Sequence, residues 1–238
     1  MADKAAKQPE SQLGWKAAEM MDDHDPFFDM PILERIAEAV RRVRQGLEQS
    51  TSALTAERVP FALIGAQAVS AWIRNKDESL ERTTPNTDLL IQRDDLERAS
   101  QVLIDHGFIR SGDTGRIFLT RSTQKERSAV RLWFADERVR AANIYPHPMV
   151  SDVVTLEGMP VLALEPLVQI KLDAWRLVDK VQLHDLATAK LIDRSWGERF
   201  CPVLVARLHE FFETTEIIDH DAINAELIGW LTQAYSEA

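Results

Sequence analysis

Cysteine is scarce in this sequence of 238 residues, which contains Cys201 and no other. A single cysteine cannot form an internal disulfide, so a reducing compartment is the simplest interpretation. We interpret Cys201 as a small buried hydrophobic residue rather than as a nucleophile. No apolar run approaches the length of a membrane span, and the first residues lack the apolar centre of a signal peptide. These absences predict a cytoplasmic protein with no membrane partner.

Positive charge is also in short supply. The formal net charge is −10 and the isoelectric point is about 5.1. This balance argues against non-specific binding to nucleic acids or to an anionic membrane, although a local basic groove is compatible with it. The sequence has no CxxC, HExxH, P-loop, GxGxxG or Gly-x-Ser-x-Gly pattern. It therefore gives no sign of the metal, nucleotide or serine sites that those patterns mark.

The clearest pattern lies in the first half of the chain. The apolar run at 61–64 stops at Gly65, which predicts a buried strand that ends in a tight turn. Residues 66–74 carry apolar side chains at helical spacing, and residues 86–91 begin polar and continue apolar, as a second strand would. Backbone N–H groups at such a turn can face a phosphate, and the first and third residues of the second strand point the same way.

With Gly65 before the helix and Asn86-Thr87-Asp88 on the next strand, this stretch resembles the nucleotidyltransferase superfamily. The family pattern is strand, Gly-Gly or Gly-Ser, helix, and then Asp-x-Asp. The sequence is most similar to the bacterial minimal nucleotidyltransferases and the AbiEii toxin-like group. Ala66 replaces the second glycine, and Asn86 replaces the first aspartate. A neutral amide binds a divalent cation far more weakly than a carboxylate does.

The resemblance implies transfer of a nucleoside monophosphate from a nucleoside triphosphate to an acceptor hydroxyl on an RNA or a protein. It implies Mg²⁺ as cofactor, with Asp88 as the ligand and Asn86 in the place of the other catalytic carboxylate. Gly65, Ala66 and Ser70 are implied to lie at the phosphates of the nucleotide.

The family also carries a third carboxylate on a later strand, where it helps to activate the attacking hydroxyl. Here the predicted strand at 130–134 contains Arg131 and no carboxylate. The alternative for Asp88 is a structural role, as a turn cap or as the partner of Arg82. Arg82 is otherwise a candidate nucleotide ligand, in a charged segment that an anionic ligand would suit.

A second resemblance lies downstream, in Lys171, Lys180 and His184-Asp185. In the family, a lysine on one helix faces the active site and a basic-acidic run opens the next helix. Lys171 and Lys180 are therefore implied to contact the nucleotide, Lys171 as a point charge on a phosphate. The alternatives are a structural salt bridge between Lys180 and Asp185, and a partly exposed His184 that is not a general base.

The whole pattern predicts an α/β (α+β) protein with a small mixed sheet of about five strands, flanked by helices. We expect an acidic tail at 1–28, an α/β core with a leading helix at 29–164, and a helical region at 165–238. Short helices are expected at 53–58 and, after the core, from 167 to 177. The exposed faces of the C-terminal helices suit a homodimer.

Two functions remain open from the sequence. One is a nucleotidyltransferase, impaired by the loss at Asn86. The other is a non-catalytic nucleotide-binding or regulatory module, for which the AbiEii-like resemblance implies a toxin–antitoxin or phage-defence role. A weaker hypothesis is an interaction protein that acts through the helix at 30–50 and the acidic tail.

Overall fold

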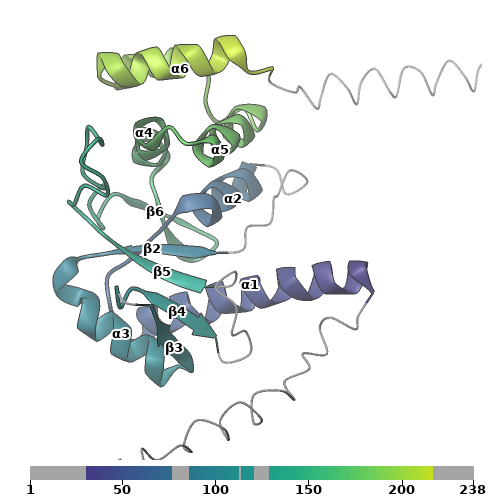
Figure 1. Ribbon diagram of the computed structural model, residues 1–238, viewed down its shortest axis with the longest axis vertical. Coiled ribbons are helices and arrows are strands. Elements are labelled where there is room, and N and C mark those ends of the chain that lie inside the picture. The colour runs from purple at the N-terminus through teal and green to yellow at the C-terminus, as the bar shows by residue number, and fades with distance from the viewer. Residues whose placement is uncertain (1–30, 77–85, 113, 121–128, 217–238) are drawn as a thin grey trace, which may run out of the picture. The chain divides into compact units, whose positions relative to one another are not determined.

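The computed structural model describes residues 31–76, 86–112, 114–120 and 129–216 (Figure 1). The compact unit that carries the candidate site begins at Val40, within the first helix. The predicted acidic tail, Arg82 and a C-terminal helix at 222–238 lie outside the described residues. The predicted boundaries at 28 and 164 stay predictions.

Helices and strands alternate along much of the chain. The helices are α1 (Ile32–Ala56), α2 (Gly65–Lys76), α3 (Leu96–Asp105), α4 (Leu164–Ala174), α5 (Leu177–Thr188) and α6 (Pro202–Thr214), with 3₁₀ turns at Arg93–Asp95 and Arg194–Arg199. The strands are β1 (Ala62–Ile64), β2 (Thr87–Ile91), β3 (Phe108–Ser111), β4 (Ile117–Thr120), β5 (Ala129–Phe134), β6 (Val153–Leu156) and β7 (Met159–Leu162). None of the described helices is both long and apolar enough to span a bilayer.

The strands form one mixed sheet in the order β3-β4-β5-β2-β1-β7-β6. β2 runs parallel to β5 and β1 runs parallel to β7, whereas the other neighbouring pairs are antiparallel. The predicted class, a mixed sheet flanked by helices, is confirmed. The sheet contains seven strands among the described residues, where the sequence predicted about five.

The last strand that the sequence predicts, at 161–164, corresponds to β7, and the edge strand predicted near Val153 corresponds to β6. The two strands form a hairpin. Its two-residue turn, Glu157-Gly158, has φ of 50° and 77°. Positive φ at both central residues gives a turn whose twist matches that of the two strands. β6 lies at the edge of the sheet, and burial alternates only weakly along it.

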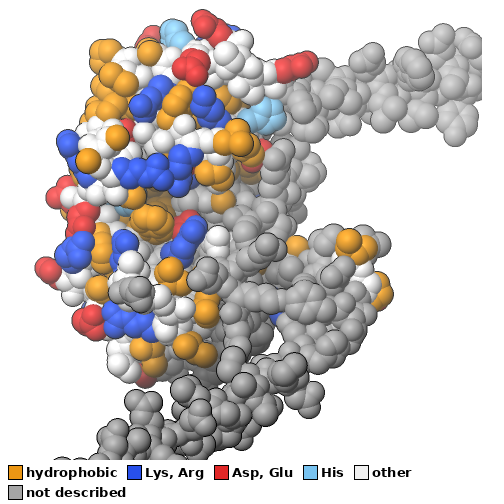
Figure 2. All heavy atoms as spheres, in the orientation of Figure 1, with side chains coloured by type: hydrophobic (Ala, Val, Ile, Leu, Met, Phe, Trp, Pro, Cys, Tyr) orange, Lys and Arg blue, Asp and Glu red, His pale blue; other side chains and the backbone are white. Residues whose placement is uncertain are grey.

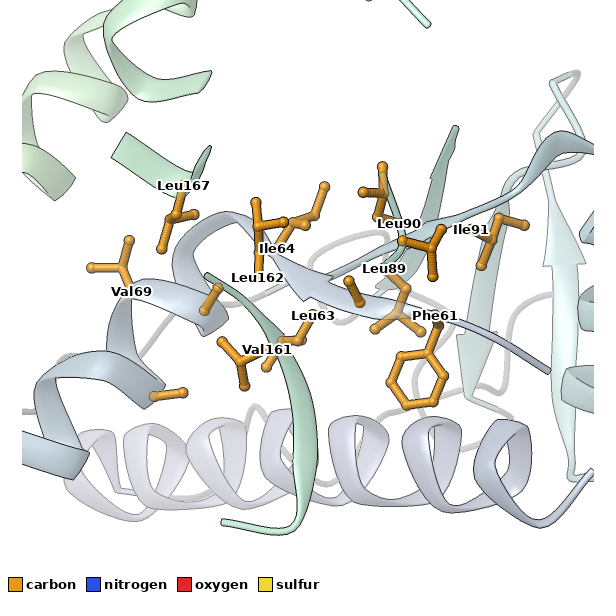
Figure 3. Packing of buried hydrophobic residues seen from close by; sticks show 14 of the residues in the cluster. Phe61, Leu63, Ile64, Val69, Leu89, Leu90, Ile91, Val161, Leu162 and Leu167 are labelled. Carbon is orange, nitrogen blue, oxygen red and sulfur yellow. The ribbon is translucent and has the colours of Figure 1, made fainter. Parts of the chain in front are cut away.

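Apolar side chains of β1, β2 and β7 form the centre of the core. Figure 3 shows Leu63, Leu89 and Val161 among these packed side chains, with Val69 of α2 and Leu167 of α4 nearby. All five are almost fully buried. This burial holds the ends of β1 and β2 in fixed positions, and the candidate site is built on those ends.

The C-terminal helices pack on α2 and on each other. Figure 1 shows α4, α5 and α6 beyond α2, away from the sheet, and α2 contacts both α4 and α5. α4 ends earlier than predicted because Trp175 takes a left-handed conformation, with φ of 51°. Leu177, expected on the buried face of this helix, instead opens α5 and is 81% exposed.

The predicted break before residue 53 is also wrong, since α1 continues to Ala56. Ser50 and Thr51 interrupt the apolar pattern, but both are buried. Their hydroxyls donate to the carbonyl of Leu47 at 3.0 and 2.8 Å, which satisfies them inside the helix.

Candidate functional site

The candidate site begins at the turn where β1 ends. Gly65 has φ of 69°, a conformation that favours glycine. A Cβ atom at this position would lie 2.5 Å from Oδ2 of Asp88. The antiparallel pairing of β1 with β2 places Ile64 opposite Asp88, which brings the carboxylate against the turn. The sequence prediction that these two positions lie together agrees with this geometry.

Asp88 is fully engaged by side chains of β5. Arg131 lies opposite it in the parallel pairing of β2 with β5. The Arg131 guanidinium donates to both carboxylate oxygens, from Nε to Oδ1 at 2.6 Å and from Nη2 to Oδ2 at 2.9 Å. The indole Nε1 of Trp133, two residues along the same face, also donates to Oδ1 at 2.9 Å. Among the described residues, the ion-pair partner of Asp88 is therefore Arg131, and the predicted pairing with Arg82 lies outside them.

A cavity of about 100 Å³ opens beside this carboxylate. We call it the Asp88 pocket. Its lining comes from the ends of β1, β2 and β5, the segment after β5, and the start of α5 with α4: Ile64, Gly65, Asp88, Trp133, Val139, Arg140, Asn143, Tyr145, His147, Ile170, Lys171, Asp173, Ala174, Arg176 and Asp179.

A buried charge network closes the side of the pocket formed by α4 and α5. Lys171 Nζ lies 3.5 Å from Oδ1 of Asp179, and Arg176 Nε donates to Oδ2 of Asp179 at 2.7 Å. The Lys171 and Asp179 side chains are 6% and 1% exposed. Burial lowers the pKa of Lys171, while the charges of Asp179 and Asp88 raise it. Asp179 also caps the first turn of α5 by accepting from the backbone N–H of Arg176 at 3.2 Å.

The third carboxylate of the pocket is likewise satisfied within the chain. Asp173 accepts the backbone N–H groups of Ile144 and Tyr145 at 2.9 and 3.1 Å. It thereby fixes the segment after β5 against α4. His147, in the same segment, lies edge-on to Trp133, and burial lowers its pKa. His147 is therefore neutral near pH 7.

The oxygen ligands that the described residues of the pocket offer do not fit Mg²⁺. A divalent cation needs several free oxygen ligands. Both oxygens of Asp88 are taken by Arg131 and Trp133, and the other two carboxylates of the pocket are bound by protein donors. The described residues contain no cluster of three or more His, Cys, Asp or Glu that could hold a metal ion. Asn86 lies outside the pocket lining, and its buried Oδ1 accepts no hydrogen bond from the described residues.

No protein-family model and no curated protein matches this sequence. Among solved structures, the antibiotic-resistance factor ANT(2'')-Ia is 13% identical over 71% of this chain and 92% of its own, with a TM-score of 0.45. A protein from H. pylori, provisionally described as a nucleotidyltransferase, is 18% identical over 76% and 85% of the two chains, with a TM-score of 0.42. JHP933 from Helicobacter pylori is 22% identical over 73% and 74%, with a TM-score of 0.42.

At these identities and scores the likenesses assign no family to this chain and say nothing of its substrate. The AbiEii-like subgroup, the RNA or protein acceptor, the toxin–antitoxin role and the homodimer stay predictions.

The predicted site residues separate into two groups. Gly65, Asp88 and Lys171 line the Asp88 pocket. Ala66 and Ser70 follow Gly65 on α2 but are not among the lining residues, and Ser70 is buried. The ammonium group of Lys180 lies 3.3 Å from Glu210 and 4.1 Å from the ring centroid of Trp175, and its contact with a nucleotide stays a prediction. It does not line the pocket, and its described ion-pair partner is Glu210 rather than Asp185.

Three arginines at or beside the pocket were not predicted as site residues: Arg131, which binds Asp88 but does not line the pocket, and the lining residues Arg140 and Arg176. Arg131 could have been found, since a charged residue in the apolar run at 129–134 needs a partner on its face of the sheet. Arg140 and Arg176 carry no such signal, because both lie outside regular elements. Cys201 is half-buried rather than buried, at the start of α6. Its thiol is hydrogen-bonded to Tyr145, which raises the pKa of the tyrosine.

Proposed function

We propose that the protein binds the phosphate groups of a nucleoside triphosphate in the Asp88 pocket without a divalent metal ion, and that it does not transfer the nucleotide. This is the non-catalytic reading that the sequence left open. The observation that carries it is the bidentate ion pair between Arg131 and Asp88. The guanidinium of Arg131 binds the carboxylate that a metal ion would need as a ligand. The positive charge required near the phosphates is therefore supplied by side chains of the protein.

The charges of the pocket support an anionic ligand. Each of its three carboxylates already has donors from the chain, whereas Arg140 makes only backbone hydrogen bonds with Asn143 among the described residues. Arg176 is 49% exposed and keeps part of its guanidinium toward solvent. Arg140 has the fork geometry that binds a phosphate in bidentate fashion, and Arg176, which donates from Nε and Nη2 to Asp179, adds its remaining N–H groups. The N-terminus of α2 at Gly65 adds a favourable dipole.

The first test compares nucleotide binding with and without Mg²⁺. Titration calorimetry with each nucleoside triphosphate is expected to give the same or higher affinity in EDTA as in MgCl₂, because the free triphosphate carries more negative charge. Binding that requires Mg²⁺ contradicts the proposal and favours the metal-dependent enzyme. Inorganic tripolyphosphate is expected to bind as well, since the proposed contacts are to phosphate.

Asp88→Asn is expected to change the affinity for a triphosphate in opposite directions for the two functions. Removing this charge releases Arg131 from its bidentate partner, so triphosphate affinity is expected to rise roughly threefold or more. In a metal-dependent enzyme the same change abolishes the metal site and lowers affinity. Asp105→Asn is the matched control, since Asp105 accepts a hydrogen bond from Gln101 on α3 and does not line the Asp88 pocket. An unchanged affinity in this control together with a loss in Asp88→Asn would overturn the proposal.

A further inference from the structure

A second and larger cavity adjoins the Asp88 pocket. It shares Trp133, Val139 and His147 with that pocket, and has a volume of about 410 Å³. Its other lining residues come from the 3₁₀ turn after β2, the β3–β4 hairpin and the end of β5: Arg93, Leu96, Thr114, Arg116, Phe134, Glu137 and Arg138. We call it the arginine cavity. Its size falls in the range of small-molecule sites.

Two of its arginines are held by aromatic rings. The Arg93 guanidinium lies 4.0 Å from the ring centroid of Phe134. The Arg116 guanidinium lies 5.4 Å from the centroid of Phe134 and 5.8 Å from that of Trp133. Cation–π contacts of this kind hold the guanidinium groups in place. The rings therefore position the two cations in the lining of the cavity.

The lining of the arginine cavity carries more positive than negative charge. Arg93 is neutralised by Glu137, which binds it through both carboxylate oxygens. This pairing lowers the pKa of Glu137. Arg116 and Arg138 have no ion-pair partner in the part of the chain that the structure describes. His147 adds no charge near pH 7, because burial lowers its pKa.

Among the described residues, two guanidinium groups without an ion-pair partner thus share one cavity, in a protein whose net charge is −10. Figure 2 shows Lys and Arg side chains gathered between the C-terminal helices and the sheet on the face seen there. Such a local excess of positive charge is stabilised by a ligand of opposite charge.

We propose that the arginine cavity binds a phosphate monoester of about mononucleotide size, as its dianion, on Arg116 and Arg138. This site is separate from the triphosphate site and does not depend on it. The dianion matches the two uncompensated charges, and the guanidinium forks match phosphate oxygens. A small ligand fits better than a nucleic acid, because the cavity volume is about 410 Å³ and the net charge of −10 repels a polyanion.

The test is titration calorimetry with adenosine 5′-monophosphate at pH 7.5, with adenosine as the uncharged control. The double variant Arg116→Gln/Arg138→Gln is expected to weaken binding of the monophosphate at least tenfold. Arg199→Gln is the matched control, because Arg199 also stacks on a ring, 4.5 Å from the centroid of Trp196, but lines neither cavity. Adenosine is expected not to bind.

A substitution that increases the affinity for the monophosphate is a sharper test than one that decreases it. Glu137→Gln removes the carboxylate that neutralises Arg93, so a third guanidinium becomes available and the monophosphate is expected to bind about threefold to tenfold more tightly. Binding is also expected to weaken below pH 6 as the phosphate takes up its second proton.

Three results overturn the proposal. One is monophosphate binding that falls in Arg140→Gln but not in the double variant, which assigns the ligand to the Asp88 pocket. Another is a weaker complex in Glu137→Gln with an unchanged melting temperature. The last is a single-stranded RNA oligonucleotide that binds more tightly than the monophosphate and depends on the same arginines. None of them contradicts the triphosphate proposal, whose tests use Asp88→Asn and Mg²⁺.

Discussion

Asp179→Ala is expected to lower the free energy of unfolding by about 3–5 kcal/mol, the usual cost of leaving a buried charge without its partner. Asp179 is 1% exposed and holds the buried ammonium of Lys171 at 3.5 Å. It also accepts hydrogen bonds from the side chain and the backbone N–H of Arg176. The substitution therefore leaves Lys171 unpaired and removes the cap of α5. Chemical denaturation followed by circular dichroism measures the change.

Two control variants separate the buried charge from other causes. Lys171→Met in the Asp179→Ala background removes the stranded charge and is expected to recover most of the loss. Glu210→Ala breaks the exposed pair with Lys180 and is expected to cost less than about 1 kcal/mol. If the double variant is no more stable than Asp179→Ala, the cost lies in the cap and not in the charge.

The pH dependence of this variant has a definite sign. Burial lowers the pKa of Lys171 in the folded protein, and Asp179 counteracts that effect. Without Asp179 the folded-state pKa falls further below that of the unfolded chain. Between those two values the unfolded state binds more protons, so stability rises with pH. The deficit of Asp179→Ala is therefore expected to be largest near pH 7 and to shrink toward pH 10.

Local patterns explain why much of the fold was predictable. The apolar run before Gly65 and the polar start of β2 are properties of neighbouring residues, and both elements form where the sequence indicated. Their juxtaposition also followed from sequence, because a strand, a helix and a strand joined in this way pack together. The class of fold and the meeting of Gly65 with Asp88 therefore rest on short-range signals.

The hydrogen-bond partners of Asp88 depend on a long-range contact that local sequence patterns do not predict. Arg131 is 43 residues away, and it meets Asp88 through the parallel pairing of β2 with β5. Strand order and register determine this contact, and neither can be predicted from the composition of a short segment. The surroundings of Lys180 also depend on long-range packing. Its helix was predicted, but the direction in which its side chain points depends on how α5 packs, which places it beside Glu210.

Gly65→Ala is expected to lower the free energy of unfolding by about 2–4 kcal/mol. A left-handed conformation costs an alanine roughly 1–2 kcal/mol. The remainder is steric, because the new Cβ would lie 2.5 Å from Oδ2 and 3.2 Å from Cγ of Asp88. Asp88 cannot move aside without weakening charge-assisted hydrogen bonds from Arg131 and Trp133, each worth about 1.5–3 kcal/mol. Thermal and chemical denaturation measure the loss.

Gly158→Ala isolates the conformational part of this cost. Gly158 has φ of 77°, yet a Cβ there would meet no atom within 4 Å. Its substitution is expected to cost about 1–2 kcal/mol, from the backbone alone. The excess cost at Gly65 then measures how firmly Arg131 holds Asp88 against the turn, and it should disappear when Asp88→Ala is combined with Gly65→Ala. Equal costs at the two glycines would mean that the Asp88 carboxylate moves away from the new Cβ without loss of stability. A carboxylate that can separate from Arg131 so easily could still bind a metal ion.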